Sequence, residues 1–221
     1  MQGVPNCNFP TDNDYEIPVL NLELQGDVID VPVRAWGGKS KHWRASRSAS
    51  FAGTWHFYVD DAKFSAVWKH PDTALKSGAP SMCEVNYSIG HTCPVWRALQ
   101  LIGQKRWISC YWQKFGGKRI FVDLNVAEKV VDPDSGDVMK DLPALNLIGV
   151  PKGWKAYSTR GSINEMEKLR AEHALACEHA GTKEISMLVY GGGKKVQEFC
   201  KVNRLEHFST EMTAFHAKKK A

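Results

Sequence analysis

The sequence predicts an α/β protein made of successive strand–helix units around a parallel sheet. From about residue 55, short apolar segments with strand patterns alternate with longer segments of helical periodicity. Strands separated by helices are joined by right-handed crossovers, which makes neighbouring strands parallel. The chain holds about five or six such units, too few for an eight-fold barrel of about 250 residues. We therefore expect a reduced β/α-barrel-like arrangement, with an open doubly wound sheet as the alternative.

Each expected element has its own local signal. The strand patterns cover residues 55–59, 81–88, 119–126, 155–159 and 185–190. The helical patterns cover residues 64–76 with a break at Pro71, 94–115, 163 to Gly181, and 196–202. Proline at the first position of the second helix is favourable, because its missing N–H has no partner there. Pro-Asp-Ser-Gly in the centre of residues 131–140 predicts a hairpin turn or a surface excursion.

The chain divides into three parts. Residues 1–54 are expected to be an irregular N-terminal segment, in which only 17–24 and 28–33 have strand character. Residues 55–210 are expected to be the α/β domain, and residues 211–221 a basic C-terminal tail. With no long apolar run and no signal-peptide pattern, we expect no membrane contact and a cytoplasmic location.

Positive charge is concentrated in two short segments. The formal net charge is +5, and three of these charges lie in the tail at Lys218–Lys220. Residues 34–47 form a basic aromatic arm that carries five cations and no acid, so the rest of the chain is mildly acidic. Cations that contact phosphate and rings that stack on bases suit single-stranded nucleic acid. The candidate nucleic-acid-binding residues are Arg34, Trp36, Lys39, Lys41, Trp43, Arg44 and Arg47. The alternative is a solvated loop whose tryptophans pack on the core.

Charged side chains follow several of the expected strands. In parallel α/β folds the functional site forms at the carboxyl ends of the strands. The candidate catalytic residues at these ends are Asp60, Asp61, Glu84, Asp123 and Arg160. Such a cluster could bind a divalent cation through oxygen ligands or perform general acid–base catalysis.

Structural roles compete with this interpretation. Asp60 or Asp61 could cap the helix that begins near Phe64, and Glu84 could pair with Arg106 or Arg160. Asp123 lies within an apolar strand, where a carboxylate needs either a partner or a functional site.

A glycine-rich turn follows the last expected strand. Gly191, Gly192, Gly193 and Lys194 stand between this strand and a helix, an arrangement that can hold phosphate at the helix N-terminus. The spacing of a Walker motif is absent, and a triple glycine is also an ordinary flexible turn. The sequence has no haem, flavin or dinucleotide signature, and no histidine pair has metal-site spacing. The cofactor is left open.

From residue 55 onward the chain resembles a family of bacteria, phages and plasmids known as domain of unknown function 4417. The motifs that carry the resemblance are Trp55-His-Phe-Tyr-Val-Asp-Asp61, Phe64, Trp68-Lys-His-Pro71, Pro94, Arg106, Tyr111-Trp-Gln113, residues 149–159 and Val189-Tyr-Gly191. The family usually has Pro-Asp-Phe-Ser where this chain has Cys83-Glu-Val-Asn86, so Glu84 replaces a shorter carboxylate. The resemblance implies a mobile-element context, and with it a bacterial or phage-infected host cell, but no particular reaction.

Two functions of different classes follow from these observations. The first is a nucleic-acid-associated protein of a phage or other mobile element. The second is a small barrel-like enzyme that acts on a nucleotide, nucleobase or phosphorylated sugar through the strand-end residues. A purely structural or regulatory interaction protein is a third class. Whether the protein is an enzyme is left open by the sequence.

Overall fold

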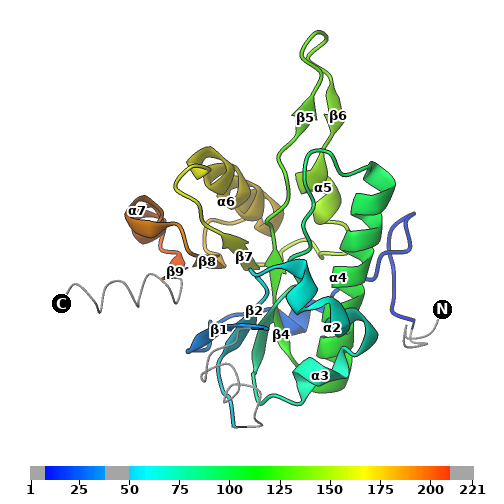
Figure 1. The fold of residues 1–221 in the computed structure, drawn as a ribbon, viewed down its shortest axis with the longest axis vertical. Helices are drawn as coiled ribbons and strands as arrows, with labels where there is room; N and C mark the ends of the chain where they lie inside the picture. Colours follow the sequence, from blue (N-terminus) through cyan, green and yellow to red (C-terminus); the bar gives the residue numbers. More distant parts are fainter. Residues whose placement is uncertain (1–7, 38–49, 210–221) are drawn as a thin grey trace.

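The computed structural model describes residues 8–37 and 50–209 of the chain. Within these residues, seven strands form one sheet in the order β1-β2-β3-β4-β7-β8-β9, and every neighbouring pair is parallel. Their bounds are β1 Val33–Ala35, β2 Thr54–His56, β3 Ser81–Cys83, β4 Arg119–Asp123, β7 Ala156–Arg160, β8 Ser186–Tyr190 and β9 Glu206–Phe208. The spatial order therefore repeats the chain order (Figure 1).

The sheet curls into a nearly closed, barrel-like arrangement. A doubly wound sheet reverses its strand order at a switch point, and this sheet has no reversal. The rings of His56 on β2 and Tyr190 on β8 also lie 3.9 Å apart between centroids. Three strands separate β2 from β8, a distance of about 19 Å in a flat sheet. The contact therefore requires strong curvature, and the expected barrel-like arrangement is confirmed.

Helices cover the outer face of the curved sheet. The helices of the crossovers are α2 Ser65–Lys69, α3 Asp72–Leu75, α4 Val95–Gly116, α5 Leu142–Asn146, α6 Met166–Ala180 and α7 Gly193–Val202. The 3-10 turn η2 Asp61–Lys63 precedes α2, and the 3-10 turn η1 Leu22–Leu24 precedes β1. Successive side chains of β7 point to opposite faces of the sheet. Thr159 bonds to Glu172 of α6 on the outer face, whereas Ser158 is in register with Asp123, which faces the interior. Figure 1 shows α4 along one side of the sheet and α6 and α7 on another. No helix in the described residues is long and apolar enough to cross a membrane.

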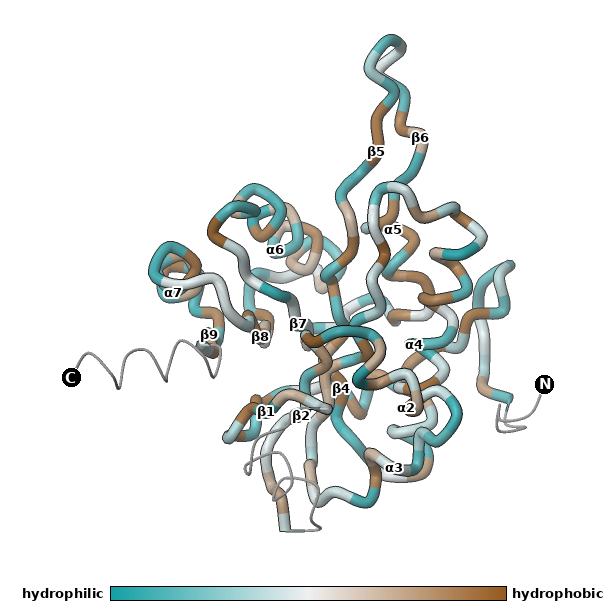
Figure 2. Tube along the Cα trace, in the orientation of Figure 1, coloured by the Kyte–Doolittle hydropathy of each residue, from teal (hydrophilic) through white to brown (hydrophobic). Residues whose placement is uncertain are grey.

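A two-stranded hairpin projects from the body between β4 and β7. It is formed by β5 Val130–Val131 and β6 Val138–Lys140, which pair antiparallel, as the turn motif in this segment predicts. Figure 1 shows it standing clear of the sheet, and Figure 2 shows hydrophobic residues along its strands and hydrophilic ones at its tip.

The N-terminal segment closes the end of the sheet opposite the carboxyl ends of the strands. Gln25 makes a parallel bridge to Ile120, and Gly26 lies so close to Phe121 that a Cβ atom there would be 2.4 Å from the ring. Asp30 accepts hydrogen bonds from Ser81 and Arg119. This end is therefore filled by the chain itself, and the opposite end is the one available for a site.

The described part of the N-terminal segment is more ordered than the sequence predicts. Val33–Ala35 is the first strand of the main sheet and overlaps the expected strand segment 28–33 only at Val33, whereas the expected strand segment 17–24 contains the 3-10 turn η1 instead. With Pro32 before it and Gly37 after it, this edge strand is too short for a visible alternation of apolar and polar residues. The final strand, Glu206–Phe208, is equally short, and the sequence pattern did not predict it either.

Candidate functional site

A cavity of about 890 Å³ lies at the carboxyl ends of β2, β3, β4 and β7. We call this end of the sheet the mouth. The residues lining it belong to the segments that follow these four strands, together with the first turn of α6. The mouth is formed as the parallel topology requires, since the loops after parallel strands meet at one end of the sheet.

The floor of the mouth contains a chain of three polar side chains. The Lys168 ammonium donates to Asn125 Oδ1 at 2.8 Å, and Asn125 Nδ2 donates to Asn86 Oδ1 at 3.1 Å. Lysine can only donate, so this order fixes which end of each amide is oxygen. It leaves Asn86 Nδ2 as a donor with no partner among the described residues. Asn86 is 8% exposed and lines the cavity, so this donor is held toward the space a ligand would occupy.

A buried carboxyl group lies behind this chain. Glu172 on α6 is 7% exposed, and its Oε2 accepts a hydrogen bond from Thr159 Oγ1 at 2.6 Å. Its Oε1 is 3.8 Å from the Lys168 ammonium and has no hydrogen-bond partner in the described residues. Burial raises the pKa of Glu172 to about 8, although Lys168 and Thr159 act in the opposite direction. Its carboxyl group is therefore mostly protonated at neutral pH and can exchange a proton near physiological pH.

Two of the candidate catalytic carboxylates are fully buried in a charge network beneath the mouth. Glu84 pairs with Arg106 of α4, and its Oε2 accepts the backbone N–H of Asp123 at 3.2 Å. Asp123 pairs with Lys105 at 3.2 Å and accepts the Tyr58 hydroxyl at 3.2 Å. Burial raises the pKa of Asp123, and Lys105 beside it acts to lower that pKa. The network fastens α4 to the ends of β3 and β4. The ion pair between Glu84 and Arg106 is the structural alternative that the sequence left open.

The other three strand-end candidates lie near the surface of the mouth. Asp60 lines the cavity with its side chain 83% exposed, and it makes no helix-capping hydrogen bond. Asp61 accepts hydrogen bonds from the backbone and hydroxyl of Ser88, which ties the loop after β2 to the loop after β3. Arg160 lines the cavity and makes no side-chain ion pair in the described residues. The five candidates thus share one end of the sheet but do not form a single cluster.

The glycine turn lies outside this cavity. Gly191, Gly192 and Gly193 all have positive φ, and a Cβ atom at Gly192 would be 2.4 Å from the Val196 side chain. Glycine is therefore required there by the turn itself. Lys194 is exposed and lines a separate surface pocket together with residues of α7 and His207. Phosphate binding by this turn stays a prediction.

The described part of the basic aromatic arm is largely structural. Trp36 is buried and packs edge-to-face on Trp55, with 5.1 Å between ring centroids. Arg34 is on the edge strand β1 and partly exposed. The other candidate residues of the arm, Lys39, Lys41, Trp43, Arg44 and Arg47, lie outside the described residues. For Trp36, the packing alternative left open by the sequence is the one observed.

Sequence reasoning missed Lys168 and Glu172. The signal for Glu172 was present, because it falls on the same helical stripe as Leu169 and Ala176, which are buried. An acidic residue on the apolar stripe of a helix needs a partner or a role. Among the described residues, no group of three or more His, Cys, Asp or Glu side chains is arranged to hold a metal ion.

The chain belongs to the family described as Domain of unknown function (DUF4417), which matches residues 9–136. The match thus includes the N-terminal segment that packs against the sheet. The chain is 27% identical over 147 residues to the Gene 1 protein of Mycobacterium phage D29, which covers 66% of this chain and 48% of that protein. It is 26% identical over 110 residues to the Gene 1 protein of Mycobacterium phage L5, covering 49% of this chain and 45% of that protein. The chain spans about half the length of these relatives. No solved structure is significantly similar to it.

Proposed function

We propose that the mouth of the barrel binds a small ligand rich in hydrogen-bond acceptors, of the nucleotide, nucleobase or phosphorylated-sugar class, and that the protein acts on it as an enzyme. The observation that carries this proposal is the polar chain in the floor. Once Lys168, Asn125 and Asn86 have bonded to one another, the groups left over are donors. Acceptors of a ligand, such as phosphate oxygens or ring carbonyls, complement them.

Two further features support an acceptor-rich ligand. Glu165 makes no side-chain capping bond at the start of α6, and the first turn of this helix lines the cavity. Its backbone N–H groups and the positive end of the helix dipole favour negative charge. Arg160, which has no ion-pair partner in the described residues, lies on the same cavity.

The rim of the mouth has the opposite character. It carries four carboxylates, which are Asp60, Glu128, Glu165 and Glu167. Carboxylates only accept hydrogen bonds when ionised, so they complement hydroxyl or amino groups on the outer part of a ligand. Sugars and nucleobases carry both hydrogen-bond donors and hydrogen-bond acceptors, whereas an inorganic anion carries only acceptors.

Glu172 supports chemistry as well as binding. A carboxyl group with a pKa of about 8 can deliver or accept a proton at neutral pH. It is 3.8 Å from Lys168, which touches the cavity. When the Glu172 carboxyl loses its proton it becomes a counter-charge for the Lys168 ammonium, so its protonation is coupled to the charge that meets a ligand on the floor.

The test uses isosteric variants of two asparagines in the same cavity. Asn86→Asp keeps the acceptor that Asn125 needs and replaces the free donor with a second acceptor. Binding of nucleotides, nucleobases or phosphosugars, measured by thermal shift and calorimetry, should weaken tenfold or more. Asn164→Asp adds the same charge at the exposed rim and should have a smaller effect. Equal effects of the two variants would contradict a donor-specific floor.

A second function rests on the charge pattern. Five cations without an acid in residues 34–47 favour contact with nucleic acid, and the relatives are phage proteins. Nucleic-acid binding by the arm would be separate from ligand binding in the mouth, because the arm and the cavity are built from different residues. If the ligand of the mouth is a nucleotide within a nucleic-acid strand, both functions concern the same substrate.

A further inference from the structure

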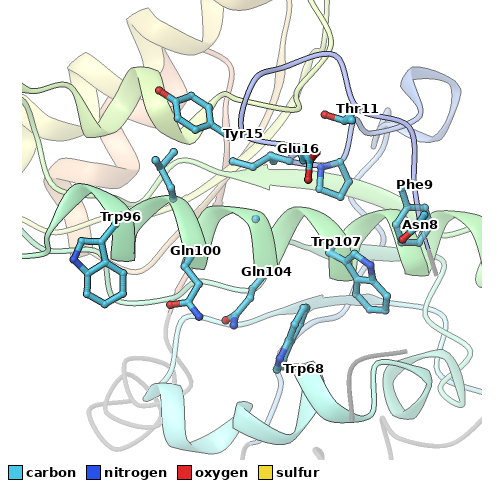
Figure 3. Close-up of a pocket in the computed structure, with 14 residues that line it drawn as sticks. Asn8, Phe9, Thr11, Tyr15, Glu16, Trp68, Trp96, Gln100, Gln104 and Trp107 are labelled. Carbon is cyan, nitrogen blue, oxygen red and sulfur yellow. The ribbon is translucent and has the colours of Figure 1, made fainter. Parts of the chain in front are cut away.

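A second cavity, of about 730 Å³, lies on the opposite side of α4 from the charge network and has a different chemistry. One face of α4 forms its floor, the segment 8–18 forms one wall, and Trp68 of α2 lies on the other side. Figure 3 shows Gln100 and Gln104 extending from α4 on the side of Trp68, with Trp96 and Trp107 at the two ends of the row. We call this cavity the aromatic groove.

The helical spacing explains the groove. Trp96, Gln100 and Gln104 are four residues apart, so their side chains form one stripe along α4. Gly103 beside them has no side chain, and a Cβ atom there would meet only Ile17, at 3.7 Å. The stripe therefore borders a depression where a longer side chain would fill the space.

The exposure of the rings in the groove is unusual. Trp96 is 69% exposed, and Trp68 is half-buried against Trp107 in an edge-to-face contact at 5.4 Å. A large indole left in water does not gain the free energy that burial of its apolar surface would give. Packing of the barrel does not require Trp96, because its side chain points away from the core.

The groove is almost uncharged, and several of its hydrogen-bond donors have no partner in the described residues. Glu16 is the one charged residue among the described residues that line it. The Arg97 guanidinium donates to Gln100 Oε1 at 2.7 Å, which leaves the Gln100 amide nitrogen as the free end. The indole N–H groups of Trp68 and Trp96 have no hydrogen-bond partner in the described residues, and an indole can only donate.

We propose that the aromatic groove binds a proline-rich segment of a partner protein in the polyproline II conformation. Proline lacks an N–H group, so such a segment presents carbonyl acceptors and flat apolar rings but no backbone donors. Such a segment therefore complements a groove that is lined by indole rings and amide donors. The absence of cations from the described lining disfavours nucleic acid, which needs them for its phosphates. Aromatic-lined grooves are a general solution for polyproline II ligands.

The dimensions agree with a short segment. Trp96 and Trp107 are eleven residues apart on α4, which at about 1.5 Å per residue separates them by about 16 Å. A polyproline II helix rises about 3.1 Å per residue, so about five residues span the groove.

The test is a titration of the full chain with a capped decaproline peptide, followed by tryptophan fluorescence and calorimetry. Wild type should bind, Trp96→Ala should weaken binding tenfold or more, and Gln100→Glu should weaken it by removing the donor while keeping the partner of Arg97. Trp96 is exposed, so its loss should leave the melting temperature unchanged. Phe115→Ala removes an exposed ring at the other end of α4, outside the groove, and should leave binding intact.

Three outcomes would overturn the proposal. The first is no binding of decaproline by wild type at millimolar concentration. The second is equal binding by wild type and Trp96→Ala, since the peptide would then lie elsewhere. The third is binding of a neutral oligosaccharide, such as maltoheptaose, without binding of decaproline, which would assign the groove to sugars.

Discussion

His56 and Tyr190 meet ring to ring across the interior of the sheet, although three strands separate β2 from β8. Tyr58 stacks on both, with centroids 5.6 Å from His56 and 6.1 Å from Tyr190. Burial lowers the pKa of His56 to about 3, so the imidazole is neutral in this cluster. Tyr58 also lines the mouth and bonds to Asp123. The ring cluster thus connects closure of the barrel to the floor of the proposed site.

Breaking the buried pair between Glu84 and Arg106 should destabilise the protein strongly. Glu84→Gln leaves the Arg106 guanidinium buried without its counter-charge, and such losses cost about 3–5 kcal/mol. Chemical denaturation would measure the change in the free energy of unfolding. Glu167→Gln removes one partner of the exposed pair between Glu167 and Arg170 and should cost less than about 1 kcal/mol. Similar losses in both variants would show that Glu84 is not held in the buried network.

Glu172 should make stability fall as pH rises. Its pKa is raised from an ordinary value of 4.5 to about 8, so the folded state holds a proton that the unfolded chain releases within this window. The stabilising contribution is complete below pH 4.5 and is lost as pH rises through about 8. Glu172→Gln cannot lose the proton, so its free energy of unfolding should decline less between pH 5 and pH 8. Parallel pH profiles for wild type and Glu172→Gln would contradict the raised pKa.

Residues 34–47 should give weak, salt-dependent binding to single-stranded nucleic acid. Each phosphate contact releases counterions, so the logarithm of the affinity should fall with the logarithm of salt concentration. Fluorescence anisotropy with a labelled oligonucleotide would measure this slope. Replacing Lys39, Lys41, Arg44 and Arg47 by glutamine should flatten it, whereas Trp36→Phe should alter stability more than binding because Trp36 is buried. Absence of binding by wild type at low salt would remove the nucleic-acid function.

Lys168 and Lys194 allow a direct comparison of two proposed phosphate sites. If the mouth holds the ligand, Lys168→Met should weaken binding about tenfold, and Lys194→Ala should have little effect. The reverse result would assign the phosphate to the glycine turn, as its sequence predicts. Lys195→Ala is the control for a change of charge at the start of α7. Calorimetry with a nucleoside monophosphate would compare the three variants.

Much of the fold could be predicted because its signals are local. The strands at β4, β7 and β8 and the long helix α4 were found within a few residues, from apolar runs, Pro94 and glycine stops. The edge strands β1 and β9 are three residues each and carry too little pattern. The choice between a barrel and an open sheet depends on strand order, which no local pattern contains. Sequence reasoning could favour the barrel only by counting units.

The sequence predicted which end of the sheet the candidate catalytic residues share, but not the contacts that they make there. Topology alone placed Asp60, Glu84, Asp123 and Arg160 at one end of the sheet. It could not show that Glu84 and Asp123 would be neutralised by Arg106 and Lys105, because a pairing across 22 or 18 residues depends on how α4 packs. The polar floor was missed for the same reason. Its members come from three different crossover units and become a chain only in the folded state.

The most direct measurement is a crystal structure of the protein soaked with a nucleoside monophosphate at millimolar concentration. We predict ligand density in the mouth, with an acceptor within about 3 Å of Asn86 Nδ2 and of the Lys168 ammonium. The same soak of Asn86→Asp should show an empty mouth. Density at Lys194 or elsewhere with the mouth empty in wild type would contradict the account.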